Sequence, residues 1–207
     1  MPIRSVRKSF PRIAGLLFTI LAIAAISQAQ EASLQNQDVK IKNFGQMDDR
    51  FYRGGQPKEQ DYKVLSALGV KTVIDLTDDP KEYEKPLVES LGMKYIHIPM
   101  IAKKYPTEEA TATFLKVVND PDTGKFFLHC AGGRHRTGAM GAVYRFKFYD
   151  WNFDQVYQEM KKYDFYTSWG HGAFKDFVKD YYTQIQAAKT SSHSTPARES
   201  NQRAEER

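Results

Sequence analysis

The residues best suited to chemistry form one short run, residues 129–138, with the sequence His-Cys-Ala-Gly-Gly-Arg-His-Arg-Thr-Gly. Two of its glycines, Gly132 and Gly133, can adopt backbone conformations that turn successive N–H groups towards one centre and so form an anion-binding nest. A helix that begins near Thr137 would direct the positive end of its dipole at the same centre. The run therefore predicts a loop that binds an oxyanion such as phosphate.

Cys130 is the only cysteine of the chain and stands at the base of this expected loop. Inward N–H groups, a helix N-terminus and the guanidinium of Arg136 favour the charged form of sulfur, so its pKa is expected to fall below the usual value of about 8.5. The thiolate would be a nucleophile, and Thr137 could donate its hydroxyl to the sulfur. Arg136 offers a planar fork to two phosphate oxygens. A lone cysteine is more often an inert apolar residue, but this loop favours a catalytic thiol.

The other residues of the loop are candidates for substrate binding. They are Ala131, Gly132, Gly133, Arg134, His135 and Gly138. Arg134 and His135 make the loop unusually basic, and with Lys103 and Lys104 they could hold a second phosphate, as in inositol phosphates or phosphoinositide headgroups. They could equally be solvated charges at the rim. Trp169, followed by Gly170, indicates either a mobile loop or a residue that caps the core.

The elements that would position this loop alternate along the chain. Apolar runs predict strands at 51–53, 72–76, 94–98 and 125–129, and apolar periodicity predicts helices at 62–68, 107–118, 137–149, 153–162 and 173–185. Strands that alternate with helices favour an α/β fold: a single domain with a central, mostly parallel sheet of four to five strands flanked by helices. Ligands bind beyond the carboxyl ends of such strands, which is where Cys130 would lie.

The run also resembles the signature of the protein tyrosine phosphatase superfamily, a cysteine, five residues, then Arg-Thr, and the short domain resembles its dual-specificity branch. Supporting similarity to a bacterial group within that branch extends over about residues 50–165. It rests on Phe51-Tyr52-Arg53-Gly54-Gly55-Gln56-Pro57, Gly69-Val70-Lys71-Thr72-Val73-Ile74-Asp75-Leu76, Ile98-Pro99-Met100, Tyr144-Arg145 and Glu159-Met160. The resemblance implies hydrolysis of phosphate monoesters, on phosphorylated proteins or small phosphoesters, through a cysteinyl-phosphate intermediate.

One part of the family pattern is missing. Members of the superfamily usually carry an aspartate some thirty residues before the cysteine, and it protonates the leaving oxygen. Here that position falls near Ala102, in a stretch without a carboxylate. The remaining candidates for the acid are Asp78, Asp79, Glu108 and Glu109, although both pairs also fit ordinary turn and helix-start positions. Asp120 and Asp122 are expected at the wrong end of the sheet.

Two alternatives to this phosphatase stay open. A phosphate-binding pseudophosphatase is supported only by the missing aspartate, and the intact Cys130, Arg136 and Thr137 argue against it. A thiol-based reductase or sulfurtransferase could use a similar anion loop, but the His-Cys and Arg-Thr-Gly flanks go beyond what such loops share. A single cysteine and five histidines without paired spacing predict no disulfide, no metal and no cofactor.

The two ends of the chain differ from its middle. Residues 1–29 carry four basic residues, an apolar run at 13–26 and Ser27-Gln28-Ala29, which is typical of a cleaved secretory signal. Its removal lowers Lys plus Arg from 30 to 26 against 25 Asp plus Glu, so the net charge falls from +5 to +1 and no nucleic-acid partner is indicated. We expect a lead-in at 30–37, the phosphatase domain at 38–186 and a disordered tail at 187–207. Export to a periplasmic or extracellular location follows, or membrane anchoring if the signal is retained.

Overall fold

The computed structural model describes residues 39–193 and centres on a five-stranded sheet. Its strands are β1 (Gly45–Gln46), β2 (Phe51–Gly54), β3 (Thr72–Asp75), β4 (Lys94–His97) and β5 (Phe126–His129). The spatial order is β1-β2-β5-β3-β4, and only β1 runs antiparallel to its neighbour. The predicted α/β class with a mostly parallel sheet is therefore confirmed. The two-residue β1 was not predicted, because it is too short for a hydrophobic pattern.

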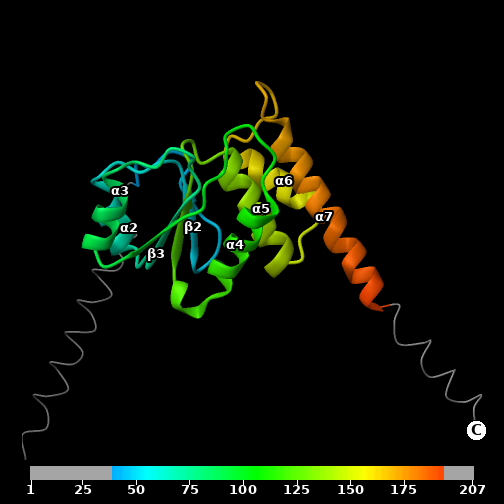
Figure 1. Cartoon of the computed structure of the whole chain (residues 1–207), viewed down its shortest axis with the longest axis horizontal. Helices are drawn as coiled ribbons and strands as arrows, with labels where there is room; N and C mark the ends of the chain where they lie inside the picture. Colours follow the sequence, from blue (N-terminus) through cyan, green and yellow to red (C-terminus); the bar gives the residue numbers. More distant parts are fainter. Residues whose placement is uncertain (1–38, 194–207) are drawn as a thin grey trace, which may run out of the picture. The chain divides into compact units, whose positions relative to one another are not determined.

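Helices cover both faces of the sheet (Figure 1). They are α2 (Asp61–Ala67), α3 (Glu84–Ser90), α4 (Glu108–Asn119), α5 (His135–Phe148), α6 (Phe153–Lys162) and α7 (Gly172–His193), with a short 3-10 helix η1 (Pro121–Thr123) before β5. α2 and α3 lie on one side of the strands, and α4 to α7 lie on the other. No sequence pattern predicted α3, because Pro86 lies in its first turn, where proline is tolerated but obscures a helical pattern.

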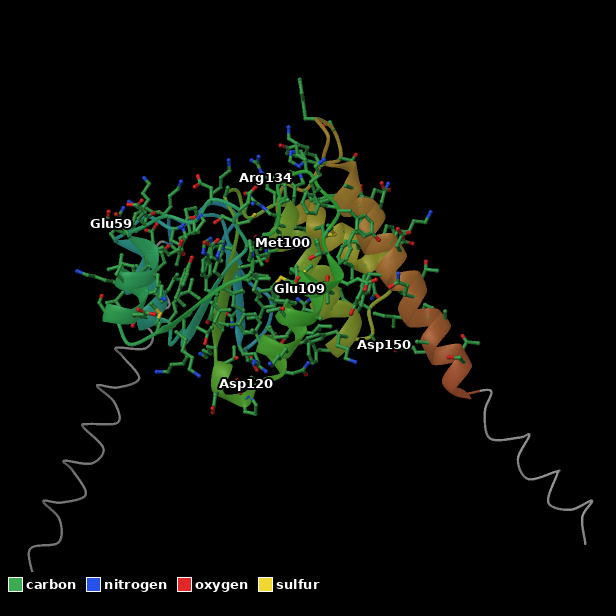
Figure 2. All side chains as sticks on the ribbon, in the orientation of Figure 1. Glu59, Met100, Glu109, Asp120, Arg134 and Asp150 are labelled. Carbon is green, nitrogen blue, oxygen red and sulfur yellow. The ribbon has the colours of Figure 1, made fainter. Side chains whose placement is uncertain are left out.

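β5 is the central strand, and its side chains serve two cores. Phe126 and Leu128 are buried in the core shared with α4 to α7, whereas Phe127 is buried in the core shared with α2 and α3. A strand covered on both faces is apolar throughout, which explains the run that predicted it. Figure 2 places Arg134, which follows β5, at one end of the sheet and Asp120, which precedes it, at the other. Asp120 is therefore remote from the loop, as expected.

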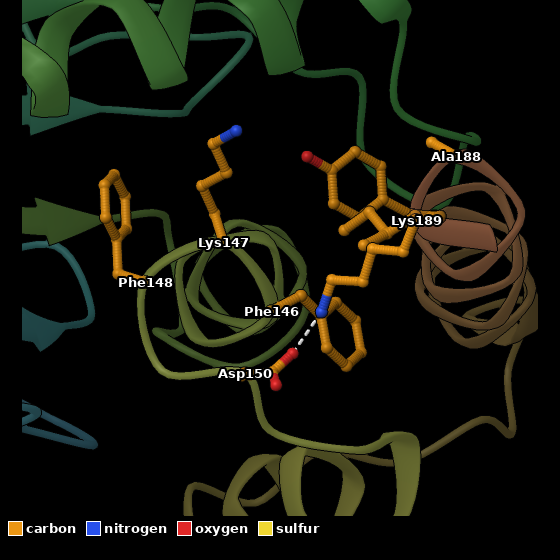
Figure 3. A pocket seen from close by; sticks show the side chains of 8 residues that line it. Phe146, Lys147, Phe148, Asp150, Ala188 and Lys189 are labelled. Carbon is orange, nitrogen blue, oxygen red and sulfur yellow. Dashed lines mark hydrogen bonds and ion pairs between the residues drawn. The ribbon is translucent and has the colours of Figure 1, made fainter. Parts of the chain in front are cut away.

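The last helix corrects one predicted boundary. We expected the domain to end at Gln186, but α7 continues to His193, over the first seven residues of the predicted tail. Lys189 forms an ion pair with Asp150, across a hollow of about 490 Å³ between α5 and α7 that Phe146 and Ile185 line (Figure 3). This long-range contact and the good helix formers Ala187 and Ala188 extend the helix beyond its apolar stripe.

The predicted signal and lead-in, and residues 194–207 of the predicted tail, lie outside the described residues. Within residues 39–193, no helix has the length and apolar character needed to cross a bilayer.

Candidate active site

Donors from outside the loop hold the backbone that follows Cys130. Three successive carbonyls, those of residues 131–133, accept hydrogen bonds from the backbone N–H of Gln56 (3.3 Å), from Nδ2 of Asn43 (2.8 Å) and from Nη2 of Arg53 (2.5 Å). Because these carbonyls are bound on the outer side, the neighbouring N–H groups are left to face the centre of the loop. The loop is thus arranged to receive an anion.

Gly133 is required at its position for two reasons. Its φ of +66° lies in the left-handed region, which L side chains rarely adopt. A β-carbon there would also lie 2.4 Å from the carbonyl carbon of Gly54, inside the neighbouring strand end. The glycine therefore lets the loop turn against β2, where Arg53 reaches its carbonyl.

The sulfur of Cys130 lies where the loop concentrates positive potential. Burial by itself raises the pKa of this thiol, but the hydroxyl of Thr137, the charge of Arg136 and the backbone N–H groups of Thr137 and Gly132 outweigh it and lower the pKa. The hydroxyl of Thr137, as a donor to the sulfur, contributes most to this lowering. α5 begins at His135, two residues earlier than predicted, so its first turn faces the thiol.

One nitrogen of Arg136 is fixed by the loops that follow β3 and β4. Nη1 donates to Oδ1 of Asp78 at 2.6 Å, to the carbonyl of Met100 at 2.9 Å and to that of Leu76 at 3.4 Å. Within residues 39–193, no side chain or carbonyl occupies Nη2 or Nε of the same guanidinium. The arginine is therefore held by one edge and presents the other to a ligand.

None of the four candidates for the general acid lines the cavity above Cys130, where a leaving oxygen would be protonated. The pKa of Asp78 is lowered, chiefly by the hydrogen bond from the backbone N–H of Ala102 and also by Arg136, so its carboxylate carries no proton at neutral pH. The side chain of Asp79 is 90% exposed and lies 3.5 Å from Lys81. Both aspartates do lie at the predicted sheet edge, but Asp78 fixes the arginine instead.

The two glutamates belong to the first turn of α4. Glu108 lines a separate hollow between α4 and α7, and Glu109 is exposed. The cavity above Cys130 has a volume of about 190 Å³ and, among the described residues, no carboxylate lines it. Its lining consists of Ala102, Lys103, Cys130, Ala131, Gly132, Arg134, His135, Arg136, Tyr166, His171 and Phe174.

The wall of this cavity corrects the expectation of a basic Arg134-His135 pair. His135 is buried and stacks on His171, with ring centroids 3.7 Å apart and an angle of 7° between the planes. Burial, followed by the neighbouring His171, lowers the pKa of His135 to about 4, so the imidazole is neutral at pH 7. Positive charge at the rim comes from Arg134 and Lys103. Arg134 is partly neutralised by Asp164 at 3.3 Å.

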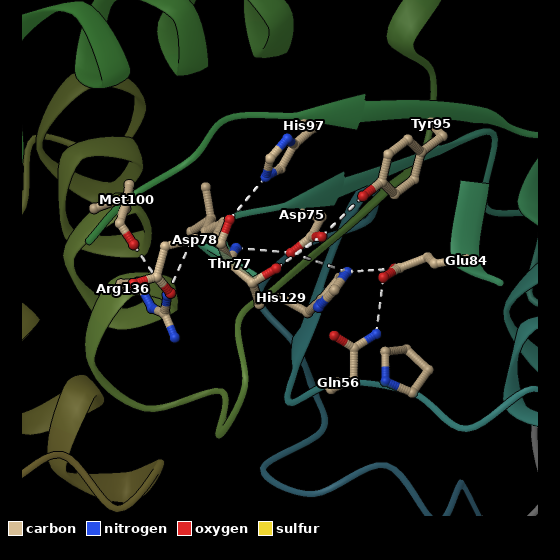
Figure 4. A network of polar contacts seen from close by, with 12 residues as sticks. Gln56, Asp75, Thr77, Asp78, Glu84, Tyr95, His97, Met100, His129 and Arg136 are labelled. Atoms are coloured by element: carbon tan, nitrogen blue, oxygen red, sulfur yellow. Dashed lines mark hydrogen bonds and ion pairs between the residues drawn. The ribbon is translucent and has the colours of Figure 1, made fainter. Parts of the chain in front are cut away.

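A buried polar network surrounds His129, the residue before Cys130, and was not predicted (Figure 4). Nε2 of His129 lies 2.7 Å from Oε1 of Glu84, and both side chains are fully buried. The Glu84 carboxylate also accepts from Nε2 of Gln56 at 2.8 Å, while Asp75 accepts from the hydroxyl of Tyr95 at 2.8 Å. No sequence signal identified Glu84, because it belongs to the unpredicted α3.

This network is better described as an ion pair than as a metal centre. Ligand atoms of Asp75, Glu84 and His129 lie within 4.8 Å of one another, as a metal site would require. However, the direct contact between Glu84 and His129 leaves no room for an ion between them, and other donors already occupy Asp75. Burial opposes both charges, yet their attraction raises the pKa of His129 and lowers that of Glu84.

Replacing Glu84 by glutamine is expected to lower the free energy of unfolding by about 2–3 kcal/mol, because it removes one charge of a buried pair. The raised pKa of His129 gives stability that is present below about pH 6.5 and lost as pH rises through the folded-state pKa. The lowered pKa of Glu84 gives stability present above about pH 4.5 and lost on further acidification. Urea unfolding from pH 4 to 9 should therefore show a flatter pH dependence in Glu84→Gln.

The matched control is Glu89→Gln, an exposed glutamate on the same helix. An equal loss of stability in both variants would contradict the ion pair.

Comparisons with known proteins agree with this geometry. The family model described as "DSP-PTPase phosphatase fused to NAD+ Kinase" matches residues 22–180. The probable tyrosine-protein phosphatase DG1060 of Dictyostelium discoideum is 33% identical over 126 residues, which cover 58% of this chain and 75% of that protein. The inositol diphosphatase DSP3 of Arabidopsis thaliana is 27% identical over 125 residues, which cover 58% of this chain and 61% of that protein.

The fold is also found in a solved structure, the core catalytic domain of the PP-IP phosphatase SIW14 from S. cerevisiae. It superposes with a TM-score of 0.62 at 19% identity, over 75% of this chain and 96% of that domain. At this identity the likeness concerns the fold alone.

Proposed function

Because this chain belongs to the family of DSP-PTPase phosphatases and is a cysteine-dependent phosphoric monoester hydrolase, we propose that Cys130 is its nucleophile, Arg136 its phosphate-binding arginine and Thr137 the donor to the sulfur. The remaining loop residues bind the phosphate through their backbone N–H groups. One observation supports this assignment. Donors from outside the loop bind three successive loop carbonyls, next to a thiol whose pKa is lowered.

The reaction has two steps. In the first, the thiolate of Cys130 attacks phosphorus, the S–P bond forms, and the bond from phosphorus to the leaving oxygen breaks. The N–H groups of the loop and the free edge of Arg136 bind the equatorial oxygens throughout. In the second step water attacks phosphorus, the S–P bond breaks, and inorganic phosphate leaves. Hydrogen bonding from Thr137 stabilises the thiolate that is released.

The test is hydrolysis of p-nitrophenyl phosphate by the full chain in the presence of a chelator. We expect metal-independent turnover that vanadate inhibits, and a phosphate label on Cys130 after rapid quenching. Absence of turnover with retained phosphate binding would favour the pseudophosphatase instead. Persistent turnover without any label at Cys130 would contradict the assigned nucleophile.

A second candidate activity is removal of the terminal phosphate from a diphosphate, as in an inositol diphosphate. Because no carboxylate of the described residues lines the cavity, we expect the leaving group to depart as an anion. A phosphate leaving group, with a second pKa of about 6, does so more readily than a phenol with a pKa of about 10. Arg134 and Lys103 at the rim could bind the additional phosphates. Relatives of this chain are named as tyrosine phosphatases and as inositol diphosphatases, which fits either substrate class.

A substrate series should separate these two candidates. Without an acid, kcat/KM is expected to fall steeply from p-nitrophenyl phosphate to phenyl phosphate, by roughly 10²-fold or more, because general acid catalysis contributes about 10²- to 10⁴-fold. An inositol diphosphate should exceed phosphotyrosine peptides in kcat/KM, and Lys103→Gln should raise KM for the inositol diphosphate selectively. The matched control is Lys63→Gln, an exposed lysine on α2. Equal rates for both aryl esters would indicate an acid from outside the cavity.

We propose that the protein acts after export, supported by the signal-like residues 1–29. N-terminal sequencing of the mature protein should begin at Gln30. A retained Met1 would instead indicate an anchored or unexported protein.

A further inference from the structure

Two exposed apolar side chains flank the catalytic cavity. Trp169, in the connection between α6 and α7, is 83% exposed, and Ile101, in the loop after β4, is 63% exposed. The two loops meet, because a β-carbon at Gly170 would lie 3.5 Å from Cδ of Lys103. Both loops also line the cavity, through Lys103 and His171. Trp169 therefore does not cap the core, which was one of the two expectations for it.

The backbone of this rim is strained at two residues. Trp169 and Lys103 have φ values of +59° and +63°, in the left-handed region that non-glycine residues seldom adopt. The stack of His171 on His135 and the hydrogen bond from the N–H of His171 to the carbonyl of Ser168 (3.3 Å) hold the α6–α7 connection in place. In Figure 1 this connection projects beyond the ends of the two helices that it joins. Trp169 is therefore exposed on the convex tip that this connection forms.

The charge around this tip is positive. Lys103 and Lys104 are exposed, and neither forms an ion pair in the part of the chain that the structure describes. Asp164 pairs with Arg134, and Asp78 pairs with Arg136. Asp180 accepts a hydrogen bond from the hydroxyl of Tyr105, the residue after Lys104, and Asp176 also lies near that tyrosine. The rim therefore combines exposed apolar groups with unpaired cations.

We propose that this rim, formed by Ile101, Lys103, Lys104 and Trp169, docks on an anionic phospholipid surface. Tryptophan is favoured at the level of lipid headgroups, and lysines beside it are attracted to anionic lipids. A protein partner fits less well, because stable protein interfaces bury about 1,200 Å² or more against a complementary surface, and this tip is small and convex. Docking would direct the opening of the cavity towards the membrane. The binding goes beyond the proposed activity and does not depend on it.

The test measures the fluorescence emission of Trp169. The chain has two tryptophans, so in full-length protein carrying Trp151→Phe the emission reports Trp169 alone. A local readout is needed because residues 1–29 could attach any variant to vesicles. Vesicles that contain phosphatidylglycerol should shift the emission to shorter wavelength, and brominated acyl chains should quench it. Replacing both lysines, Lys103→Gln with Lys104→Gln, should weaken the response about 25-fold, at about fivefold per lysine.

The control pair is Lys63→Gln with Lys85→Gln, two exposed lysines on α2 and α3, which lie on the other side of the sheet from α7. These changes should leave the response unchanged. An unchanged Trp169 emission with anionic vesicles would overturn the proposal. An equal response to vesicles of neutral phosphatidylcholine, or equal losses in the two lysine pairs, would overturn it as well. Turnover of p-nitrophenyl phosphate is measured separately, so failure of the docking and failure of the proposed activity are distinguishable.

Discussion

Replacing Cys130 by serine is expected to reduce kcat/KM for p-nitrophenyl phosphate by at least about 10⁴-fold. The loop lowers the pKa of a thiol that burial alone would raise, so the sulfur reacts as a thiolate. A serine hydroxyl in the same place stays protonated and is a poor nucleophile without an adjacent base. Steady-state kinetics with the wild type and the variant measure the loss.

The same variant should still bind phosphate or vanadate, because the loop N–H groups and Arg136 are unchanged. Calorimetric titration with inorganic phosphate is the matching control, because it shows that the variant is folded and that its phosphate-binding loop is intact. In the wild type, alkylation by iodoacetamide should persist below the ordinary thiol pKa of about 8.5, and bound phosphate should protect the thiol. Hydrolysis retained in Cys130→Ser would contradict covalent catalysis.

Replacing Arg136 by lysine is expected to lower kcat/KM by about 10³-fold, the second-largest effect. The guanidinium is fixed through Nη1 by Asp78, Met100 and Leu76, and it presents Nη2 and Nε together to the phosphate. An ammonium group cannot make both sets of contacts, although it keeps the charge. Affinity for vanadate should fall along with kcat/KM, because the lost contacts are strongest in the transition state.

Asp78→Asn is the companion variant, because it separates the two possible roles of this carboxylate. If Asp78 fixes Arg136, the loss should be about tenfold and equal for p-nitrophenyl phosphate and phenyl phosphate. If Asp78 were the general acid, the loss should be greater for phenyl phosphate, whose leaving group needs the proton more. The lowered pKa of Asp78 favours the first result.

Much of the fold was predictable because buried parallel strands carry continuous apolar runs. Strands β2 to β5 lie within one residue of the predicted ranges at each end, and α6 has the predicted bounds, with a capping box between Asn152 and Gln155. The failures have physical reasons. β1 is too short for a pattern, Pro86 obscured α3, and α7 extends eight residues beyond its predicted end at 185, over a segment that carries no apolar stripe.

The character of the anion-binding loop was predictable from the sequence. Its cysteine, glycines and arginine lie within residues 129–138, so their chemistry depends on local backbone geometry that neighbouring residues encode. Charged residues inside apolar strand runs, Arg53 in β2 and Asp75 in β3, were the available signs of a polar role in the core.

The tertiary structure alone decided which distant residues serve that loop. Arg53 and Gly133 are 80 residues apart, Asp78 and Arg136 are 58 apart, and Glu84 and His129 are 129 − 84 = 45 apart. Such contacts follow from the strand order, which places β5 between β2 and β3, and no local pattern records that order. The same topology made Asp78 a partner of the arginine and left the cavity above Cys130 without a carboxylate among the described residues.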